Sequence, residues 1–344
     1  MARTFVPNLV VDRRSFLAGA AAAGTLLTGT GTAAAQARAK VKYLTPFGYL
    51  IGFGETMYAD TGGFFAKEGL DVEIEGGRGS AMSVQQVMGG NVLLSRTGGT
   101  DHIKAYAKDP SIVAIGEIFQ RDIFYVISHA DKPIRSAADL AGKTMGVVSP
   151  GGATENLLDM MLTSAGIPAT QTERQAVGNA PSAFELVKLG RVAGYIATSD
   201  TVFQLRSDKQ PVVAWSTDDA APCPGQVYMT SRASLDKNGD LLAKFFRAVH
   251  ACLGAMIQAE NNLGPVVDSM LTKYDVFEAK RPDKGVPVLK NSLQHTFAAP
   301  YRDKLRSSPA RWNSAYELMV KTKIIAPLDK RDFYDDSVVK AAFG

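Results

Sequence analysis

Residues 143–162, KTMGVVSPGGATENLLDMML, have the pattern of a buried strand that passes through a glycine turn directly into a helix. The apolar run 145–148 predicts the strand, and leucine and methionine recur at helical spacing over 157–162. Unpaired N–H groups and the partial positive charge at such a helix start attract anions or polar acceptors. We therefore expect the turn to hold a ligand, with a plain strand-to-helix connection as the alternative. The glycine spacing is neither GxGxxG nor GxxxxGK(S/T), which disfavours a nucleotide-binding fold.

The N-terminal segment has the pattern of a twin-arginine export signal. Arg13 and Arg14 precede Phe16 and Leu17, and a weakly apolar run of alanine and glycine follows. This run is shorter than the roughly 20 residues needed to span a bilayer, which argues against a membrane anchor. We expect residues 1–37 to form the signal, with cleavage near Ala35 or Ala37, and the mature chain to be periplasmic without direct membrane insertion.

The composition is that of a globular protein large enough for two lobes. The chain has 344 residues, of which 46% are hydrophobic and 21% are charged. The formal charge of +4 includes three arginines and one aspartate of the export signal, so the mature chain is nearly neutral and has no basic stripe for nucleic acid. Cys252 lies on an apolar helical face, which favours a buried free thiol over a disulfide with Cys223.

Strand-like and helix-like segments alternate from Val41 onward, which is typical of sheets covered by helices. Two strand segments, 111–119 and 123–128, follow each other almost without a turn, and we expect them to cross from one lobe to the other. Residues 225–229 are expected to return the chain. The predicted division is a signal peptide at 1–37, a first lobe at 38–120 plus 227–344, and a second lobe at 121–226.

Several elements of the first lobe are predicted from local pattern. We expect one helix over 54–65, a helix with Ser80 as its N-cap, and a short strand at 92–94. Apolar residues at i, i+3 and i+4 over 241–257 predict a long helix that packs in the core.

Three segments in this order resemble a known family. They are FFAKEGLDVE at 64–73, GGRGS at 76–80 and SAADLAGKTMGV at 136–147. Together they resemble the periplasmic substrate-binding proteins of ABC importers for nitrate, sulfonates, taurine and thiamine-pyrimidine precursors. The resemblance implies an α/β fold of the type II periplasmic kind, with two lobes, each a mostly parallel sheet flanked by helices, joined by two hinge strands. It also implies a monomer without a cofactor that captures a small organic or anionic molecule and delivers it to a permease and an ATPase.

The family's ligand-contacting loops fall at strand ends and helix starts, where ligands bind in open α/β sheets. On this sequence they are 46–51, 77–80, 97–101, 149–154 and 198–200. The candidate ligand-binding residues are Phe47, Tyr49, Arg78, Ser80, Arg96, Thr97, Asp101, Arg121, Ser149, Gly151, Gly152, Thr154, Thr198 and Asp200.

The chemistry of these candidates leaves alternatives open. A guanidinium group suits a carboxylate or sulfonate, so one of Arg78, Arg96 and Arg121 is expected to contact the ligand, with ion pairing as the alternative for each. Arg96 stands where the sulfonate and nitrate pattern has a small or apolar residue. Asp101 suits an amino or ring N–H group, or else pairs with Arg96. Phe47, Tyr49 and Phe53 suit a planar ligand by stacking.

No pattern in the sequence supports catalysis or a metal site. The four histidines are scattered, HExxH and GxSxG are absent, and no Cys/His ligand set is present. We therefore expect a binding protein and not an enzyme. The alternatives are an enzyme on the same fold, as in the thiamine-pyrimidine and menaquinone-pathway relatives, and a module that presents its ligand to a periplasmic sensor.

Overall fold

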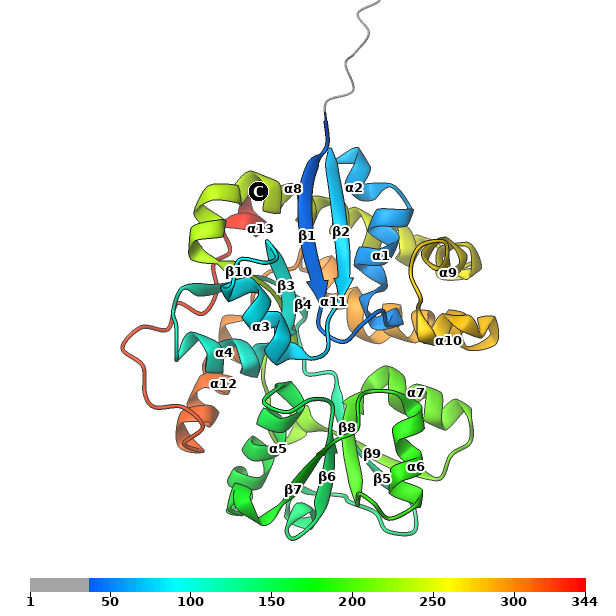
Figure 1. The fold of residues 1–344 in the computed structure, drawn as a ribbon, viewed down its shortest axis with the longest axis vertical. Coiled ribbons are helices and arrows are strands. Elements are labelled where there is room, and N and C mark those ends of the chain that lie inside the picture. The colour runs from blue at the N-terminus through cyan, green and yellow to red at the C-terminus, as the bar shows by residue number, and fades with distance from the viewer. Residues whose placement is uncertain (1–36) are drawn as a thin grey trace, which may run out of the picture. The chain divides into compact units, whose positions relative to one another are not determined.

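The computed structural model describes residues 37–344, apart from the side chains of residues 277, 278 and 282 (Figure 1). The predicted export signal up to residue 36 lies outside the described residues. None of the helices in the described part of the chain has the length and hydrophobicity of a membrane span.

The first sheet has five strands in the order β2-β1-β3-β10-β4. Their bounds are β1 (Ala39–Thr45), β2 (Leu70–Gly76), β3 (Leu94–Gly98), β4 (Ile112–Phe119) and β10 (Gln226–Ser231). β1 is parallel to β2 and β3, with Ala39 opposite Leu70, whereas β10 is antiparallel to both β3 and β4. Apolar clusters pack on both faces of the sheet, so all eight residues of β4 are buried.

The second sheet repeats this arrangement in the order β7-β6-β8-β5-β9. Its strands are β5 (Phe124–His129), β6 (Thr144–Val147), β7 (Glu173–Ala176), β8 (Gly194–Thr198) and β9 (Val212–Ser216). β6 is parallel to β7 and β8, and β5 is antiparallel to β8 and β9. The antiparallel strand is β10 in the first sheet and β5 in the second. Each is the first strand that the chain forms after it crosses from the other sheet. The two sheets with their helices form two lobes, which confirms the predicted fold class.

Helices cover both sheets (Figure 1). The first lobe carries α1 (Gly54–Thr61), α2 (Phe64–Lys67), α3 (Ser80–Met88), α4 (Gly99–Tyr106), α8 (Arg232–Gln258), α9 (Gly264–Leu271), α10 (Pro282–Ser292), α11 (Ala298–Arg302), α12 (Pro309–Lys321) and α13 (Ser337–Phe343). The second lobe carries α5 (Ala153–Ser164), α6 (Phe184–Lys188) and α7 (Ser199–Ser207).

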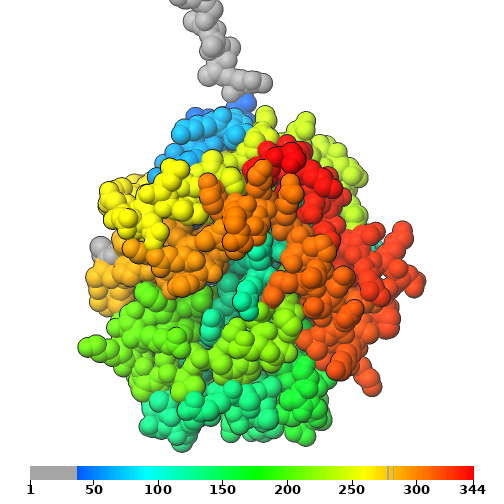
Figure 2. All heavy atoms as spheres, turned by 180° about the vertical axis from the view of Figure 1, so that it is seen from behind, coloured from blue at the N-terminus to red at the C-terminus, as the bar shows by residue number. Residues whose placement is uncertain are grey.

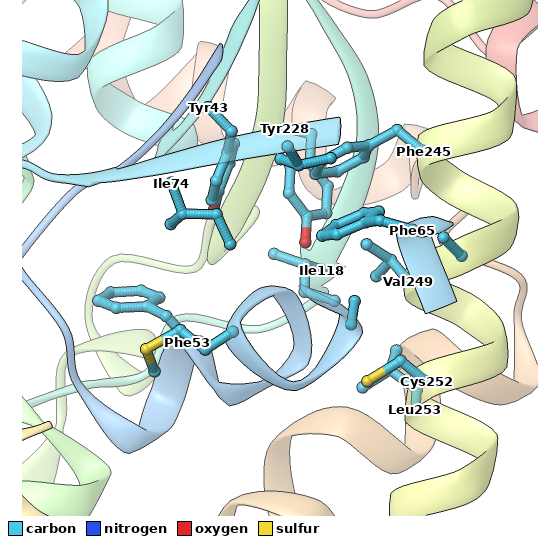
Figure 3. Packing of buried hydrophobic residues seen from close by; sticks show 14 of the residues in the cluster. Tyr43, Phe53, Phe65, Ile74, Ile118, Tyr228, Phe245, Val249, Cys252 and Leu253 are labelled. Atoms are coloured by element: carbon cyan, nitrogen blue, oxygen red, sulfur yellow. The ribbon is translucent and has the colours of Figure 1, made fainter. Parts of the chain in front are cut away.

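The core of the first lobe forms where α8 packs against β1, β10 and α2 (Figure 3). Phe245 of α8 contacts Phe65 with ring centroids 5.0 Å apart, and it contacts Tyr43 at 5.6 Å and Tyr228 at 5.7 Å. The apolar stripe of α8 thus lies in the core, as predicted. This packing holds β1 and β10 in place.

Three local predictions are wrong or incomplete. The helix expected over 54–65 is broken into α1 and α2, because Gly63 adopts a left-handed conformation with φ of 77°. The strand expected at 92–94 begins at Leu94 and continues to Gly98. Ser80 is the first residue of α3 and not its N-cap, a position that Gly79 occupies without a side-chain cap. Cys223 and Cys252 are free and buried, as expected.

Two segments cross between the sheets, at residues 120–123 and 217–225, and they are bonded to each other. Arg121 Nη2 lies 3.1 Å from Asp218 Oδ2, and Thr217 Oγ1 donates a hydrogen bond of 2.6 Å to Asp122 Oδ2. Arg311 of α12 also forms an ion pair with Asp218. Hydrogen bonds and ion pairs therefore join the two crossing segments to each other and to α12 of the first lobe.

Candidate ligand-binding cleft

The two lobes face each other with strand ends and helix starts, and they contact each other there. A Cβ atom placed on Gly98, at the end of β3, would lie 2.8 Å from Cβ of Ala153 in the second lobe. A Cβ atom on Gly79 would lie 2.3 Å from Ser149 Oγ. Glycine at these two positions therefore permits an approach between the lobes that a larger residue would block.

The turn between β6 and α5 satisfies several of its own hydrogen bonds. Thr154 Oγ1 accepts a hydrogen bond of 2.9 Å from the Val148 N–H, and the Gly151 N–H donates to the carboxylate of Glu155. Gly151 is exposed with φ of 70°, whereas Gly152 is buried against the first lobe. The Thr154 hydroxyl and the Gly151 N–H, both expected to contact a ligand, are thus engaged within the second lobe.

A small cavity of about 10 Å³ remains between the lobes. It is lined by Leu50, Gly52, Phe53, Phe119, Ile123, Thr198, Ser199, Asp200, Ser292 and Thr296. Its volume admits roughly one water molecule. Phe119, Ile123, Ser199 and Thr296 also line a hollow of about 480 Å³ on the hinge side, where the crossing segment near residue 120 is seen between the second lobe and the C-terminal helices (Figure 2).

Arg96 is fully buried at the edge of this cavity, and its charge is compensated within the first lobe. Its Nη1 lies 2.7 Å from Glu55 Oε1, which also accepts a hydrogen bond of 2.8 Å from the Tyr228 hydroxyl. The guanidinium carbon lies 4.6 Å from the ring centroid of Phe53 and 4.4 Å from that of Phe119. The possible pairing of Arg96 with Asp101 is therefore wrong, and Arg96 holds two cavity-lining rings in place.

Asp101 lies at the start of α4, is only 4% exposed and contacts the second lobe. Its Oδ1 accepts a hydrogen bond from Asn156 Nδ2 of α5, and Lys104 Nζ donates to Asn156 Oδ1 at 2.6 Å. Oδ2 makes no hydrogen bond of normal geometry among residues 37–344, although the Ser80 hydroxyl and the Ala153 N–H lie close enough to the carboxylate to lower its pKa. Burial raises the pKa of Asp101 to about 7. This side chain can accept a further hydrogen bond inside the cleft.

Other buried polar atoms at the facing strand ends and helix starts are also without partners among the described side chains and backbone. They are Ser80 Oγ, Thr97 Oγ1, Ser149 Oγ, and both Oε1 and Nε2 of Gln226. Gln226 pairs with Gly98 at the end of β3, and Thr97 pairs with Val227, so the side chains of Gln226 and Thr97 leave the strands on opposite faces of the sheet. Buried polar atoms are normally hydrogen-bonded, so these atoms are candidates for contact with a polar molecule.

Asp200, at the start of α7, lines the cavity of about 10 Å³, which Asp101 and the unpartnered polar atoms do not line. Its Oδ1 accepts hydrogen bonds from Ser292 Oγ at 2.8 Å and from Asn291 Nδ2 at 3.4 Å, both at the end of α10. Burial raises the pKa of Asp200 to about 6. The Thr198 side chain is bonded to Asn179, although Thr198 still lines the cavity.

Four of the predicted residues lie away from the polar group. Arg78 is exposed, and Arg121 is 75% exposed and ion-paired with Asp218 at the hinge. Tyr49 donates its hydroxyl to Ile74 O at 3.1 Å and packs on Tyr274, which directs it away from the cavity. Phe47 lies between the lobes, with ring centroids 6.1 Å from both Phe53 and Phe124.

Sequence patterns did not predict Phe119, Asn156, Gln226, Ser292 or Thr296. Gln226 and Phe119 reach the cleft only because β10 inserts between β3 and β4. Ser292 and Thr296 come from α10 and the π-helical turn Leu293–Phe297, which carry no local signal for a site. Asn156 lies one turn into α5 and could have been predicted, because it faces the same way as Gly152.

Within residues 37–344, no group of three or more histidine, cysteine, aspartate or glutamate side chains is placed to hold a metal ion. His102 is buried, and its Nε2 lies 2.7 Å from Phe333 O. Burial lowers the pKa of His102 to about 4, so the imidazole is neutral at pH 7.

Two similar lobes, two crossing segments and a cleft at strand ends define the class of protein: a two-lobe substrate-binding fold of the periplasmic type. The sequence identifies the family more closely. A family model described as NMT1/THI5 like matches residues 52–261, and the chain belongs to that family. This confirms the resemblance found in the sequence.

Named relatives are similar to this chain to different degrees. The formylaminopyrimidine-binding protein of Halalkalibacterium halodurans is 28% identical over 221 residues, which cover 62% of this chain and 64% of that protein. The alkanesulfonate-binding protein SsuA of Xanthomonas axonopodis pv. citri has a TM-score of 0.61 at 14% identity, covering 89% of this chain and 97% of that one. The periplasmic aliphatic sulphonate-binding protein SsuA of Escherichia coli has a TM-score of 0.59 at 17% identity, covering 86% and 92%. The last two comparisons bear on the fold alone.

Proposed function

We propose that this protein is the exported solute-binding component of an ABC importer. It captures one small molecule between its lobes in the periplasm and delivers it to a permease. The cavity of about 10 Å³ is too small for an organic molecule, so capture requires the lobes to separate and close again. A soluble carrier that closes on its ligand needs no catalytic group, and the protein acts without chemical turnover.

The ligand is a small heterocycle with N–H donors, of the aminopyrimidine class, in preference to a sulfonate or nitrate. The observation that carries this proposal is the charge balance of the cleft. Arg96 forms a buried ion pair with Glu55, although its Nε and Nη2 atoms have no hydrogen-bond partner among the described residues. Asp101 forms no ion pair with a described residue, and its Oδ2 also has no hydrogen-bond partner there. When Asp101 is ionised, its carboxylate would repel an anion, while an amino group would satisfy it. The cation beside it, Lys104, donates its hydrogen bond to Asn156.

The remaining polar atoms suit the same class of ligand. Gln226 offers one acceptor and two donor hydrogens, which match the edge of a ring that carries both an amino group and a ring nitrogen. Phe53 and Phe119 present aromatic surface to the cavity, which favours a planar molecule. The name of the Halalkalibacterium halodurans relative, a formylaminopyrimidine-binding protein, agrees with this choice.

Isothermal titration and thermal unfolding of the purified mature protein test the proposal. The panel comprises a formylaminopyrimidine, the corresponding free aminopyrimidine, an alkanesulfonate, taurine and nitrate. A pyrimidine present at about 100 times its Kd should stabilise the protein by about 2.7 kcal/mol. The anions should leave the melting temperature unchanged, and the bound pyrimidine should be recovered unaltered.

Two results would count against the proposal in different ways. Stabilisation by sulfonate or nitrate but not by a pyrimidine would reject the aminopyrimidine ligand, while the role as a solute-binding protein would stand. Conversion of a bound pyrimidine into a product would reject the carrier in favour of an enzyme on the same fold.

A further inference from the structure

Asp101 divides its two carboxylate oxygens between two environments. Oδ1 accepts a hydrogen bond from Asn156, which belongs to the other lobe, and Oδ2 is buried without a partner among the described residues. The first contact exists only while α4 and α5 meet. The second atom belongs to the group of unsatisfied polar atoms that includes Thr97 and Gln226.

The Asn156 amide is held in one orientation. Lys104 Nζ donates to Asn156 Oδ1 at 2.6 Å, and an ammonium group has no acceptor to offer. The amide oxygen therefore faces Lys104, and the amide nitrogen faces Asp101. Asn156 is fully buried, so a flipped amide would place donor against donor without water to relieve the mismatch.

We propose that Asp101 couples ligand capture to lobe closure, with Oδ2 accepting an N–H of the ligand while Oδ1 accepts the Asn156 amide of the second lobe. This inference rests on the proposed function. A ligand that bonds to Oδ2 orients the carboxylate for Asn156, and closure removes water from the ligand's own hydrogen bond. Lys104 and Asn156 act as positioning residues, because they fix Asp101 and do not contact the ligand.

A double-mutant cycle tests the coupling. Affinity for the pyrimidine is measured in Asp101→Asn, Asn156→Ala and the double variant, after circular dichroism has shown that each is folded. Each single variant should lose roughly tenfold in affinity, as expected for one hydrogen bond to a charged group. The double variant should bind nearly as well as Asp101→Asn alone. Losses that multiply to roughly a hundredfold would mean that Asn156 acts independently of Asp101 and would overturn the proposal.

Lys284→Met provides a matched control. Lys284 of α10 forms an ion pair with Asp208 of the second lobe, so it also joins the lobes, but it does not contact Asp101. Its loss should change the affinity less than about twofold. Lys104→Met should resemble Asn156→Ala, whereas Lys104→Arg, which keeps a donor, should restore part of the affinity. A Lys104→Met variant with the affinity of the wild type would contradict the positioning role.

A second readout needs no ligand and separates this inference from the proposed function. Fluorophores at exposed positions 67 and 143, one on each lobe, report the distance between lobes. Asn156→Ala should shift the unliganded protein toward the open state, and Lys284→Met should not. A wild-type protein that binds no pyrimidine would reject the proposed function. An unchanged distance in Asn156→Ala would show that the Asp101–Asn156 hydrogen bond does not hold the lobes together.

Discussion

Arg96 and Asp101 are two buried charged side chains at the same strand end, but their charges are balanced in opposite ways. Arg96 pairs with Glu55 inside the first lobe and is enclosed by rings of that lobe, among them Tyr228. Asp101 bonds to Asn156 across the cleft and keeps one oxygen without a partner among the described residues. Arg96 therefore has the same surroundings whether the lobes are together or apart, whereas the surroundings of Asp101 change with closure.

Under the proposed function, this difference assigns Arg96 to the folding of the first lobe and Asp101 to ligand binding. A buried ion pair within one lobe contributes to the structure of that lobe and gives a ligand no net charge to recognise. A carboxylate shared between lobes is sensitive to both ligand and closure. Variants that disturb these side chains one at a time test the distinction, and they differ in the size of the effect that we expect.

Removing the partner of Arg96 should impair folding most. Glu55→Ala leaves a buried guanidinium without a carboxylate and should lower the free energy of unfolding by roughly 3–5 kcal/mol. Urea denaturation measures this change. The control Glu68→Ala removes the partly exposed Glu68–Arg247 pair and should cost less than about 1 kcal/mol. Equal costs for the two variants would show that burial of the Arg96 pair has no special role.

Removing the charge of Asp101 should affect binding and spare folding. Asp101→Asn should weaken pyrimidine binding roughly tenfold or more, because the ligand N–H loses a charged acceptor. The free energy of unfolding should change by less than about 1 kcal/mol. Titration calorimetry and urea denaturation on the same preparations give both values. An intact affinity would place the ligand away from Asp101.

A wedge between the lobes should act on closure alone. Gly98→Ala adds a methyl group 2.8 Å from Ala153 Cβ, and the φ of −67° at Gly98 is an ordinary one for alanine. We expect a several-fold weaker affinity with an unchanged melting temperature, since the contact arises only in the closed state. Gly239→Ala in α8, with no atom within 4 Å of the added group, is the control and should bind as the wild type does. Tight binding by Gly98→Ala would show that the lobes need not approach so closely.

The stability of the protein should also depend on pH, and each titrating group should contribute roughly 1 kcal/mol to this dependence between pH 6 and pH 8. Burial raises the pKa values of Asp101, Glu117 and Asp122 to about 7, so the folded state holds protons that the unfolded state releases above roughly pH 4. Their contribution to stability is present at low pH and is lost as the pH rises through about 7. His102, with its pKa lowered to about 4 from the ordinary value of 6.5, partly opposes this at acidic pH.

The melting temperature should therefore be higher at about pH 6 than at about pH 8. Glu117→Gln should reduce the difference in unfolding free energy by roughly 1 kcal/mol, because one titrating group is removed far from the cleft. Differential scanning calorimetry at the two pH values measures this. Greater stability at the higher pH would contradict the expected direction.

The fold could be predicted because it depends on local pattern. The stretch 143–162 does form a strand, a turn and a helix, and the strands on either side of the first crossing were also located. The break at Gly63 was missed because apolar spacing continues through it, and only the left-handed glycine interrupts the helix.

The site could be predicted only in part. Ser80, Asp101 and Ser149 follow strand ends and Thr97 lies near the end of β3, and each carries a buried polar atom without a partner among the described residues. The role of Arg96 could not be predicted because its partner, Glu55, lies 41 residues away and meets it only through packing of α1 on the sheet. Gln226 was missed for a similar reason, since its place depends on where a late strand enters the sheet.

The bonds between the two crossing segments also determine how the lobes can move. Asp218 forms ion pairs with Arg121 and Arg311, and Thr217 donates a buried hydrogen bond to Asp122, so sliding of one crossing along the other would break these contacts. These contacts oppose sliding of one crossing along the other and favour rotation of the lobes about the crossings. Along such a path each residue of the second lobe returns to the same counterpart in the first. A ligand of the wrong shape would then stop the rotation before the lobes meet, and the cleft would not change its shape to accommodate it.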